Sequence, residues 1–216
     1  MRKQVAIIGL GRFGASVART LSELGHDVLA IDSSELVVQD VVNYVTHAVQ
    51  ADAREEETLR SLGIRNFEIV IVAIGNDIEA SILITLMLKE MDIKFIVAKA
   101  MNSLHGKVLK KVGADKVIFP EKDMGVRLAR SLISSNIMDY IELTPKDSLI
   151  EIITPSPFIN KNLGELNLRA KYGISVMAIK RDNSIIVAPG ADTRLEKKDV
   201  LILVCNNKAL DKLPSN

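Results

Sequence analysis

The feature that most constrains the fold is a set of glycines directly after an apolar segment. Val5–Ile8 is an unbroken apolar run, and Gly9, Gly11 and Gly14 follow it with the spacing G-x-G-x-x-G. This order predicts a buried strand, a tight turn, and a helix that begins near Arg12 and packs closely on the strand. The free N–H groups and positive dipole end of that helix would face an anion such as a phosphate, which Gly11 lets approach the backbone.

A second apolar segment, DVLAID, ends in an acidic residue, Asp32. An acid about 20 residues after the glycines usually binds a ribose hydroxyl. Glycines at this spacing alone can be a tight turn without a ligand. A nucleotide site is favoured here because the glycines stand between a strand and a helix, and a second strand with a terminal acid follows at the expected distance.

The same alternation of apolar runs and amphipathic stretches continues as far as Ser134. Strands are predicted at Val5–Ile8, Val28–Ile31, Thr46–Val49, Ile69–Ala73, Phe95–Ala98 and Val117–Phe119. Helices are predicted between and after them at Phe13–Leu24, Ser34–Val42, Glu55–Leu62, Ile78–Met91, Leu104–Val112 and Lys122–Ser134. Strands joined by helices form βαβ units, so residues 1–134 are predicted to form an α/β Rossmann domain with a doubly wound parallel sheet.

The pattern changes after Ser134. Residues 135–143 are interpreted as a linker and residues 144–216 as a small α+β lobe, which we expect oligomerisation to stabilise. Its expected elements are strands at Leu149–Ile153, Ser175–Lys180, Ile185–Val187 and Val200–Val204, and a short helix near Leu163–Tyr172.

Composition excludes several classes of protein. The 28 basic and 27 acidic residues give a net charge of +1, which argues against a nucleic-acid partner. The single cysteine, Cys205, excludes an internal disulfide and a cysteine zinc site, and fits a reduced cytosolic setting. The sequence has no signal peptide and no apolar run of membrane-spanning length, so any membrane role is expected to be peripheral, through a partner.

In a doubly wound sheet, ligands bind at the carboxyl ends of the strands, where the strand order reverses. This rule selects the residues that follow each predicted strand. Together with residues given by the resemblance described below, the candidates for the nucleotide site are Gly9, Gly11, Arg12, Gly14, Asp32, Ser33, Ser34, Asp52, Ala53, Ile74, Gly75, Asn76, Lys99, Ala100, Met101, His105 and Glu121.

Two of these residues carry charges that could act on a phosphate. The Arg12 guanidinium can bind phosphate oxygens bidentately, including those of a ligand in a facing subunit, or it is simply a solvated first-turn residue. Glu121 opens a helix after Pro120; it is either a divalent-cation ligand beside the phosphate or an acid that stabilises the helix dipole.

The glycine motif also admits an NAD-dependent dehydrogenase, which would need a general acid or base beside the cofactor. His26 and His47 fall at the wrong edge of the predicted sheet, and only His105 lies near the ligand edge. The C-terminal lobe lacks polar clusters that suggest catalysis. An oxidoreductase is therefore the weaker alternative, and the chain is not expected to be an enzyme.

Several segments together resemble regulator-of-K⁺-conductance (RCK, or KTN) proteins, in particular the cytosolic ring subunits of Ktr potassium transporters. They are VAIIGLGRFG, HAVQADARE, IVAIGNDIEAS, GADKVIFPEKDMG and RAKYGISVMAIKR, which extend over most of the chain. The resemblance implies a Rossmann lobe followed by a small C-terminal lobe. It also implies a homo-octameric ring on the cytoplasmic face of the membrane, docked to a K⁺-translocating subunit.

The resemblance further implies ATP or ADP as ligands and assigns roles to particular residues. Arg12 would reach the γ-phosphate held by a neighbouring subunit, and Asp32 would bind the ribose. Asp52 and Ala53 would contact the adenine side, and Glu121 would bind Mg²⁺ or Ca²⁺ between subunits. The matching nucleotide-pocket positions are Ile74, Gly75, Asn76, Lys99, Ala100, Met101 and His105.

In the C-terminal lobe, RAKYGIS and VAPG resemble segments that bind cyclic di-AMP at a dimer interface. Arg169, Ile174 and Pro189 are the candidates, and ordinary packing of a small lobe is the alternative. Two questions stay open from sequence: Asp32 suits the ribose of ATP or of NADH, and no motif separates a transporter subunit from a stand-alone nucleotide sensor.

Overall fold

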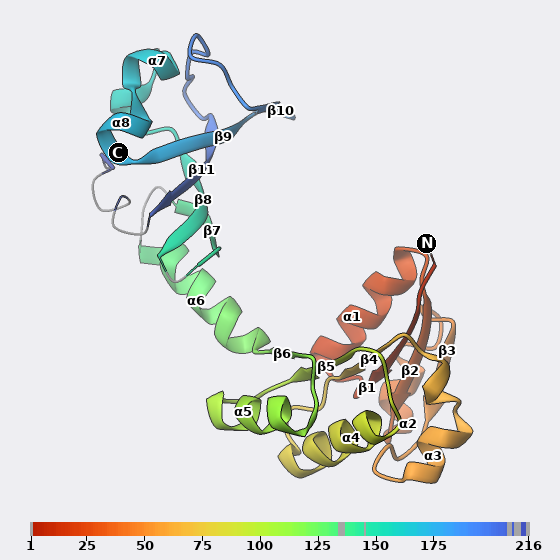
Figure 1. The fold of residues 1–216 in the computed structure, drawn as a ribbon. Coiled ribbons are helices and arrows are strands. Elements are labelled where there is room, and N and C mark those ends of the chain that lie inside the picture. Colours follow the sequence, from red (N-terminus) through yellow and green to blue (C-terminus); the bar gives the residue numbers. More distant parts are fainter. Residues whose placement is uncertain (1, 134–136, 145, 207–208, 210–212, 215–216) are drawn as a thin grey trace. The chain divides into compact units, whose positions relative to one another are not determined.

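The computed structural model describes residues 2–133, 137–144, 146–206, 209 and 213–214. The chain forms two compact units, Met1–Pro120 and Glu121–Asn216 (Figure 1). Each unit has its own sheet and its own core.

The first unit is a six-stranded, entirely parallel sheet with the strand order β3-β2-β1-β4-β5-β6. The strands are β1 (Gln4–Ile8), β2 (Asp27–Asp32), β3 (His47–Gln50), β4 (Ile69–Val72), β5 (Ile96–Lys99) and β6 (Lys116–Ile118). The helices are α1 (Arg12–Glu23), α2 (Glu35–Gln39), α3 (Glu56–Ser61), the 3₁₀ turn η1 (Ile64–Asn66), α4 (Ile78–Glu90) and α5 (Ser103–Val112). The order reverses between β1 and β4, so the predicted doubly wound Rossmann sheet is confirmed.

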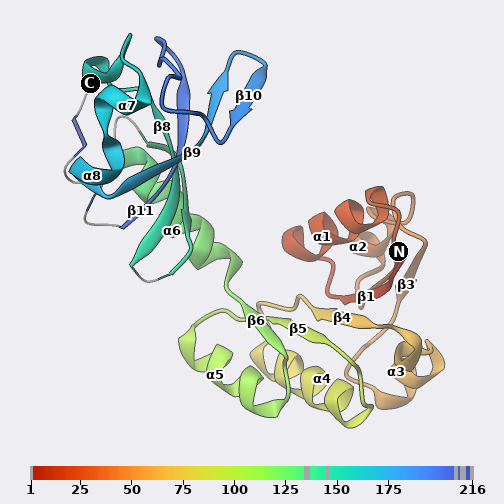
Figure 2. The same cartoon turned by 45° about the horizontal axis from the view of Figure 1, so that its top comes forward.

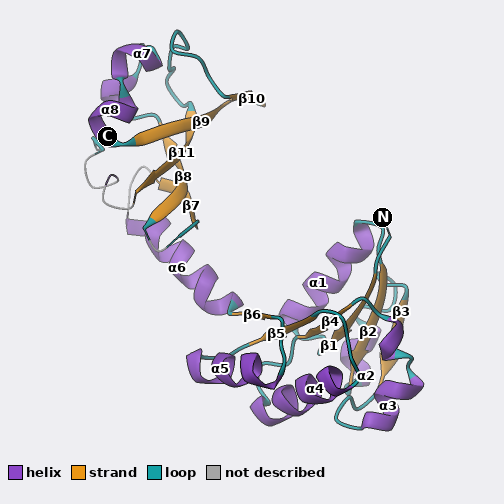
Figure 3. Ribbon diagram, viewed as in Figure 1, coloured by secondary structure: helices purple, strands orange, loops and turns teal. Residues whose placement is uncertain are grey.

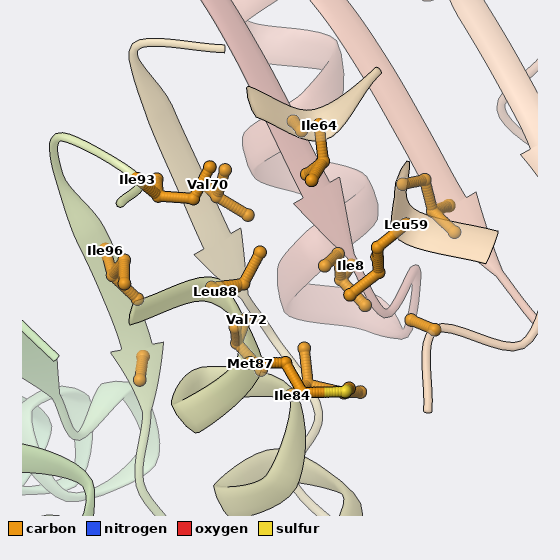
Figure 4. Packing of buried hydrophobic residues seen from close by; sticks show 14 of the residues in the cluster. Ile8, Leu59, Ile64, Val70, Val72, Ile84, Met87, Leu88, Ile93 and Ile96 are labelled. Atoms are coloured by element: carbon orange, nitrogen blue, oxygen red, sulfur yellow. The ribbon is translucent and has the colours of Figure 1, made fainter. Parts of the chain in front are cut away.

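The sheet is buried on both faces because successive residues of each strand point to opposite sides. Ala6 and Ile8 pack under α3, α4 and α5, in the core that Figure 4 shows around Leu88 and Ile96. Val5 and Ile7 point to the other face and pack under α1 and α2. This two-sided burial explains why the strands read as continuous apolar runs.

The turn after β1 depends on two glycines. Gly9 has φ +93°, which a side chain rarely adopts, and a Cβ there would lie 3.0–3.1 Å from Ile74 and the Ala73 backbone. A Cβ on Gly14, in the first turn of α1, would lie 1.9 Å from the Gly9 carbonyl oxygen. Gly11, between them, has open space around its missing Cβ. The turn therefore requires glycine at Gly9 and Gly14, whereas Gly11 leaves space in front of the helix.

The second unit contains a five-stranded sheet with the order β10-β9-β11-β8-β7, in which every neighbouring pair is antiparallel. Its strands are β7 (Ile137–Glu142), β8 (Asp147–Ile153), β9 (Ile174–Arg181), β10 (Ser184–Val187) and β11 (Val200–Asn206). Its helices are α6 (Pro120–Ile133), which begins at the last residue of the first unit, the turn η2 (Ser156–Phe158), α7 (Leu163–Leu166) and α8 (Leu168–Tyr172). Figure 2 shows the β9–β10 hairpin, and Figure 3 shows α7 and α8 beside these strands.

The segment interpreted as a linker is different in the structure. Residues 135 and 136 lie outside the described residues, as do Ser134 and Pro145, but Ile137–Glu142 is strand β7, an edge strand paired with β8. Arg127 of α6 binds Asp139 of β7 with both ends of its guanidinium, and the Nε–Oδ1 distance is 2.5 Å. The short sequence of β7 did not by itself indicate a strand. Its strand structure depends on pairing with β8, which follows after a turn.

We predict unequal effects on stability for two alanine substitutions in the turn after β1. Gly14→Ala forces α1 away from Gly9 and is expected to lower the free energy of unfolding by about 1–3 kcal/mol, the usual cost of overpacking. Gly11→Ala meets no neighbouring atom and should change it by less than about 0.5 kcal/mol. Thermal or urea unfolding of both variants measures this, and equal stabilities would contradict the packing described here.

Candidate functional site

The glycine turn and the end of β2 are joined by the carboxylate of Asp32. One oxygen, Oδ2, accepts the backbone N–H of Leu10 at 2.7 Å, and Oδ1 accepts the N–H of Ser34 at 2.9 Å. Gly9 N–H also donates to the Ile31 carbonyl at 2.8 Å. A carboxylate has about four acceptor positions, so Asp32 keeps capacity for ligand hydroxyls while it holds the turn.

The start of α1 has the properties of an anion site. No side chain caps this helix, its first turn contains no acid, and Gly11 stands at the N-cap with space around it. Arg12 is exposed and makes no hydrogen bond or ion pair with the described residues. Free backbone N–H groups, the positive end of the helix dipole and an exposed arginine thus occur together in the first turn of α1, which suits a phosphate.

Direct contacts connect the carboxyl ends of neighbouring strands. Ala51 N–H, after β3, donates to the Asp32 carbonyl at 2.9 Å. Ile74, after β4, lies so close to Gly9 that a Cβ on the glycine would be 3.0 Å from its side chain. These contacts bring the predicted residues from four strands, β3, β2, β1 and β4, to one edge of the sheet.

Lys99 extends the same edge to β5. Its ammonium lies next to Gly75, where an added Cβ would be 3.1 Å from Nζ, and 5.9 Å from the centre of the Phe13 ring. Phe13 is in the first turn of α1. Lys99 therefore places a positive charge between the glycine turn and the β4–α4 connection, at which Asn76 is exposed.

Asp52 is already engaged by a neighbouring side chain. Arg54 binds it with a bidentate pair, Nε–Oδ1 at 3.0 Å and the second nitrogen to Oδ2 at 2.6 Å. The side-chain bonds and the Arg54 backbone N–H hold the pKa of Asp52 below its usual value, and partial burial opposes them. A ligand at this point would meet an ion pair rather than an isolated carboxylate.

Three predicted residues are too buried to present side chains to a ligand. Ala53 and Ala100 belong to the core under α3–α5, and Ala100 N–H donates to the Ile118 carbonyl at 2.9 Å. His105 is only 3% exposed, whereas Met101 is 54% exposed. Ala53 and Ala100 can therefore contribute backbone atoms only.

Glu121 belongs to the second compact unit, in the first turn of α6. In the part of the chain that the structure describes, no three side chains of His, Cys, Asp or Glu gather as a metal cluster. A cation bound by Glu121 would need oxygens from a nucleotide or a second protomer to complete its coordination.

The C-terminal candidates have unequal exposure. Arg169 is exposed on α8, and Pro189 is half-buried in the loop after β10. Ile174 is 1% exposed in the core of the second unit. Only its backbone is available to a ligand in this conformation.

Sequence reasoning missed Arg54 and Phe13. The Asp-x-Arg spacing in QADARE was a local signal for the Arg54–Asp52 pair. The approach of Phe13 to Lys99 joins α1 to β5, and a local sequence pattern does not predict a contact between residues so far apart in the chain. Among the described residues, no helix is long and apolar enough to span a bilayer.

Comparison with known proteins places these features in a family. The TrkA-N domain model matches residues 5–120, and the TrkA-C domain model matches residues 148–215. The Ktr system potassium uptake protein A of Bacillus subtilis (strain 168) is 48% identical over 210 residues, which cover 97% of this chain and 95% of the relative. Protein C of the same system and organism is 47% identical over 204 residues, 94% of this chain and 92% of that protein.

The fold also matches the crystal structure of the GsuK RCK domain, with a TM-score of 0.69 and 18% identity over 98% of this chain and 46% of that one. At that identity the match supports the fold alone. With both domain models and relatives of nearly equal length in agreement, the chain belongs to the TrkA-N/TrkA-C family of regulator-of-K⁺-conductance proteins.

Proposed function

We propose that this protein is the cytosolic regulatory subunit of a Ktr-type potassium uptake system. It binds ATP or ADP at the carboxyl edge of the first sheet, and it assembles as a homo-octameric ring. The ring lies peripherally on the cytoplasmic face of the membrane and gates a K⁺-translocating subunit. The full-length similarity to two Ktr system potassium uptake proteins supports the transport role.

The observation that carries the nucleotide assignment is the convergence at the start of α1. The open space at Gly11, the uncapped helix and the exposed Arg12 offer an anion site, and Asp32 is held beside them at the end of β2. Phosphate and ribose are the two groups that such a pair of sites recognises together. An adenine nucleotide has both.

The site supports binding rather than catalysis. An oxidoreductase needs a proton donor or acceptor exposed beside the nicotinamide, and His105, the histidine that the sequence places at this edge, is buried. Regulation instead needs ligands with different affinities for two conformations of the ring. Arg12 offers such a difference, because the γ-phosphate of ATP from a facing subunit can reach it and ADP has no such group.

The cation and the second ligand belong to the same proposal. Glu121 would bind Mg²⁺ or Ca²⁺ together with phosphate oxygens, since these hard cations prefer carboxylate and phosphate ligands. Cyclic di-AMP would bind the C-terminal lobe of a dimer near Arg169 and Pro189, with the backbone at Ile174. This part rests on the sequence resemblance of the RAKYGIS and VAPG segments.

The first test is ligand preference. Titration calorimetry should show tighter binding of ATP and ADP than of NADH, because a terminal phosphate brings more negative charge to the uncapped start of α1 than the doubly esterified diphosphate of NADH does. A preference for NADH would instead support the oxidoreductase or a redox sensor.

Asp32→Asn is expected to weaken nucleotide binding at least about tenfold, because hydrogen bonds to a charged group contribute about 1.5–3 kcal/mol each. Asp27→Asn is the matched control, at the opposite end of β2. If both variants kept wild-type affinity, β2 would not reach the ribose.

The second test is the response to the γ-phosphate. Arg12→Ala should keep nucleotide binding but lose the difference in ring conformation between ATP and ADP, measured by small-angle scattering. Arg65→Ala is the control, because Arg65 is exposed at the amino end of β4, away from the site. A wild-type conformational response to ATP and ADP in Arg12→Ala would refute the switch.

Glu121→Gln should keep ATP binding, but that binding should no longer depend on Mg²⁺.

A further inference from the structure

The connection from β5 to α5 runs along the ligand edge and is held by few hydrogen bonds. Beyond Ala100, the Met101 N–H donates to Nδ1 of His105 at 3.3 Å. His105 in turn donates its own backbone N–H to Oδ1 of Asn102, the N-cap residue of α5, at 2.9 Å. Met101 is exposed, and its backbone N–H is bound by the buried imidazole.

The contact fixes the tautomer of His105. Nδ1 accepts a hydrogen bond from Met101, so in the neutral ring the proton must be on Nε2. Nε2 is buried and has no hydrogen-bond partner among the described residues. Within that part of the chain, the ring's hydrogen bonding therefore serves to hold Met101.

The loop around His105 is anchored on the side of β6. Gly106, the next residue in α5, is packed on Phe119 so closely that a Cβ would lie 2.5 Å from the ring's Cζ. Ala100 N–H, on the other side of the loop, is bound to the Ile118 carbonyl. Both ends of the loop are thus anchored to the end of β6, and His105 determines the shape of the part between them.

We propose that neutral His105 is a positioning residue of the nucleotide site, whose Nδ1 fixes the Met101 backbone in the conformation that binds the ligand. The inference rests on the proposed function, since it assigns a role to a side chain that need not touch the nucleotide. A ligand that meets the Lys99–Met101 backbone would then bind a loop that is already ordered, which lowers the entropic cost of binding.

Protonation would break this arrangement. A proton on Nδ1 would face the Met101 N–H, so two donors would oppose each other and the loop would lose its bond. Binding should therefore weaken as the pH falls and His105 gains a proton. Burial lowers the pKa of His105 below its ordinary value of about 6.5.

No neighbouring charge is a cause of this pKa shift. The charged residues of α5, of the packed α4, and of β5 and β6 are Lys107, Lys110, Lys111, Glu79, Lys89, Glu90, Lys99 and Lys116. The unfolded chain takes up its proton at a higher pH than the folded one. The stability that the folded chain gains by keeping His105 neutral is therefore fully present above about pH 6.5, and it is lost as the pH falls below that value.

The test compares two substitutions in the full-length protein. In His105→Asn, the amide oxygen takes the place of Nδ1 and can accept from Met101 without titrating. In His105→Gln, the side-chain amide takes the place of Nε2 and the acceptor is lost. At pH 7.5 we expect His105→Asn to bind ADP nearly as the wild type does, and His105→Gln to bind about two- to tenfold more weakly, the equivalent of about one neutral hydrogen bond.

The pH profile is the second readout, from pH 7.5 to 5.5 by calorimetry with ADP. The terminal phosphate of ADP itself titrates near pH 6, roughly as a phosphoserine does, and His105→Asn measures that contribution. Wild-type affinity should fall more steeply as the pH drops than that of His105→Asn, because only the wild-type side chain titrates. The comparison of the wild type with His105→Asn tests the role of His105 even if His105→Gln does not fold.

Two results would overturn the inference. Identical pH profiles for wild type and His105→Asn would show that protonation of His105 does not matter. Weak binding by His105→Asn with normal binding by His105→Gln would mean that Nε2 contacts the ligand directly. If the wild type bound no ADP at any pH, the proposed function would fail first, and the inference with it.

Discussion

The proposed nucleotide site depends on the close contact between the first turn of α1 and the end of β1. Gly14 allows this contact, because any side chain there would overlap the Gly9 carbonyl. The helix start is thereby brought to the reversal point of the sheet, next to Asp32, which holds Leu10 and Ser34. The proposed anion site and ribose site then lie side by side as a consequence of backbone packing.

Sequence alone predicted most of the first unit, because hydrophobic pattern and glycine spacing act locally. The six strands and their parallel arrangement follow from buried apolar runs such as Val5–Ile8 and from helix-length connections. The positions of Gly9 and Gly14 followed from the motif. The rule that ligands bind at carboxyl strand ends then located Arg12 and Asp32 at that edge without side-chain geometry.

Side-chain contacts between distant segments could not be predicted. The Lys99–Phe13 approach depends on rotamers, and even the Met101–His105 bond, between residues only four apart, depends on a loop shape that a linear pattern does not encode. The burial of Ala53 and Ile174 depends on packing from other elements. Strand β7 was missed for a related reason, since its stability comes from pairing with β8 and from Arg127.

The central claim is that this protein is a nucleotide-binding ring subunit, and native mass spectrometry of the purified full-length protein tests it most directly. One spectrum reports the number of protomers and the mass of any retained ligand. The account predicts eight copies of the chain, with ATP or ADP bound to the protomers. A monomer or dimer that retained no nucleotide after incubation with ATP and Mg²⁺ would contradict it.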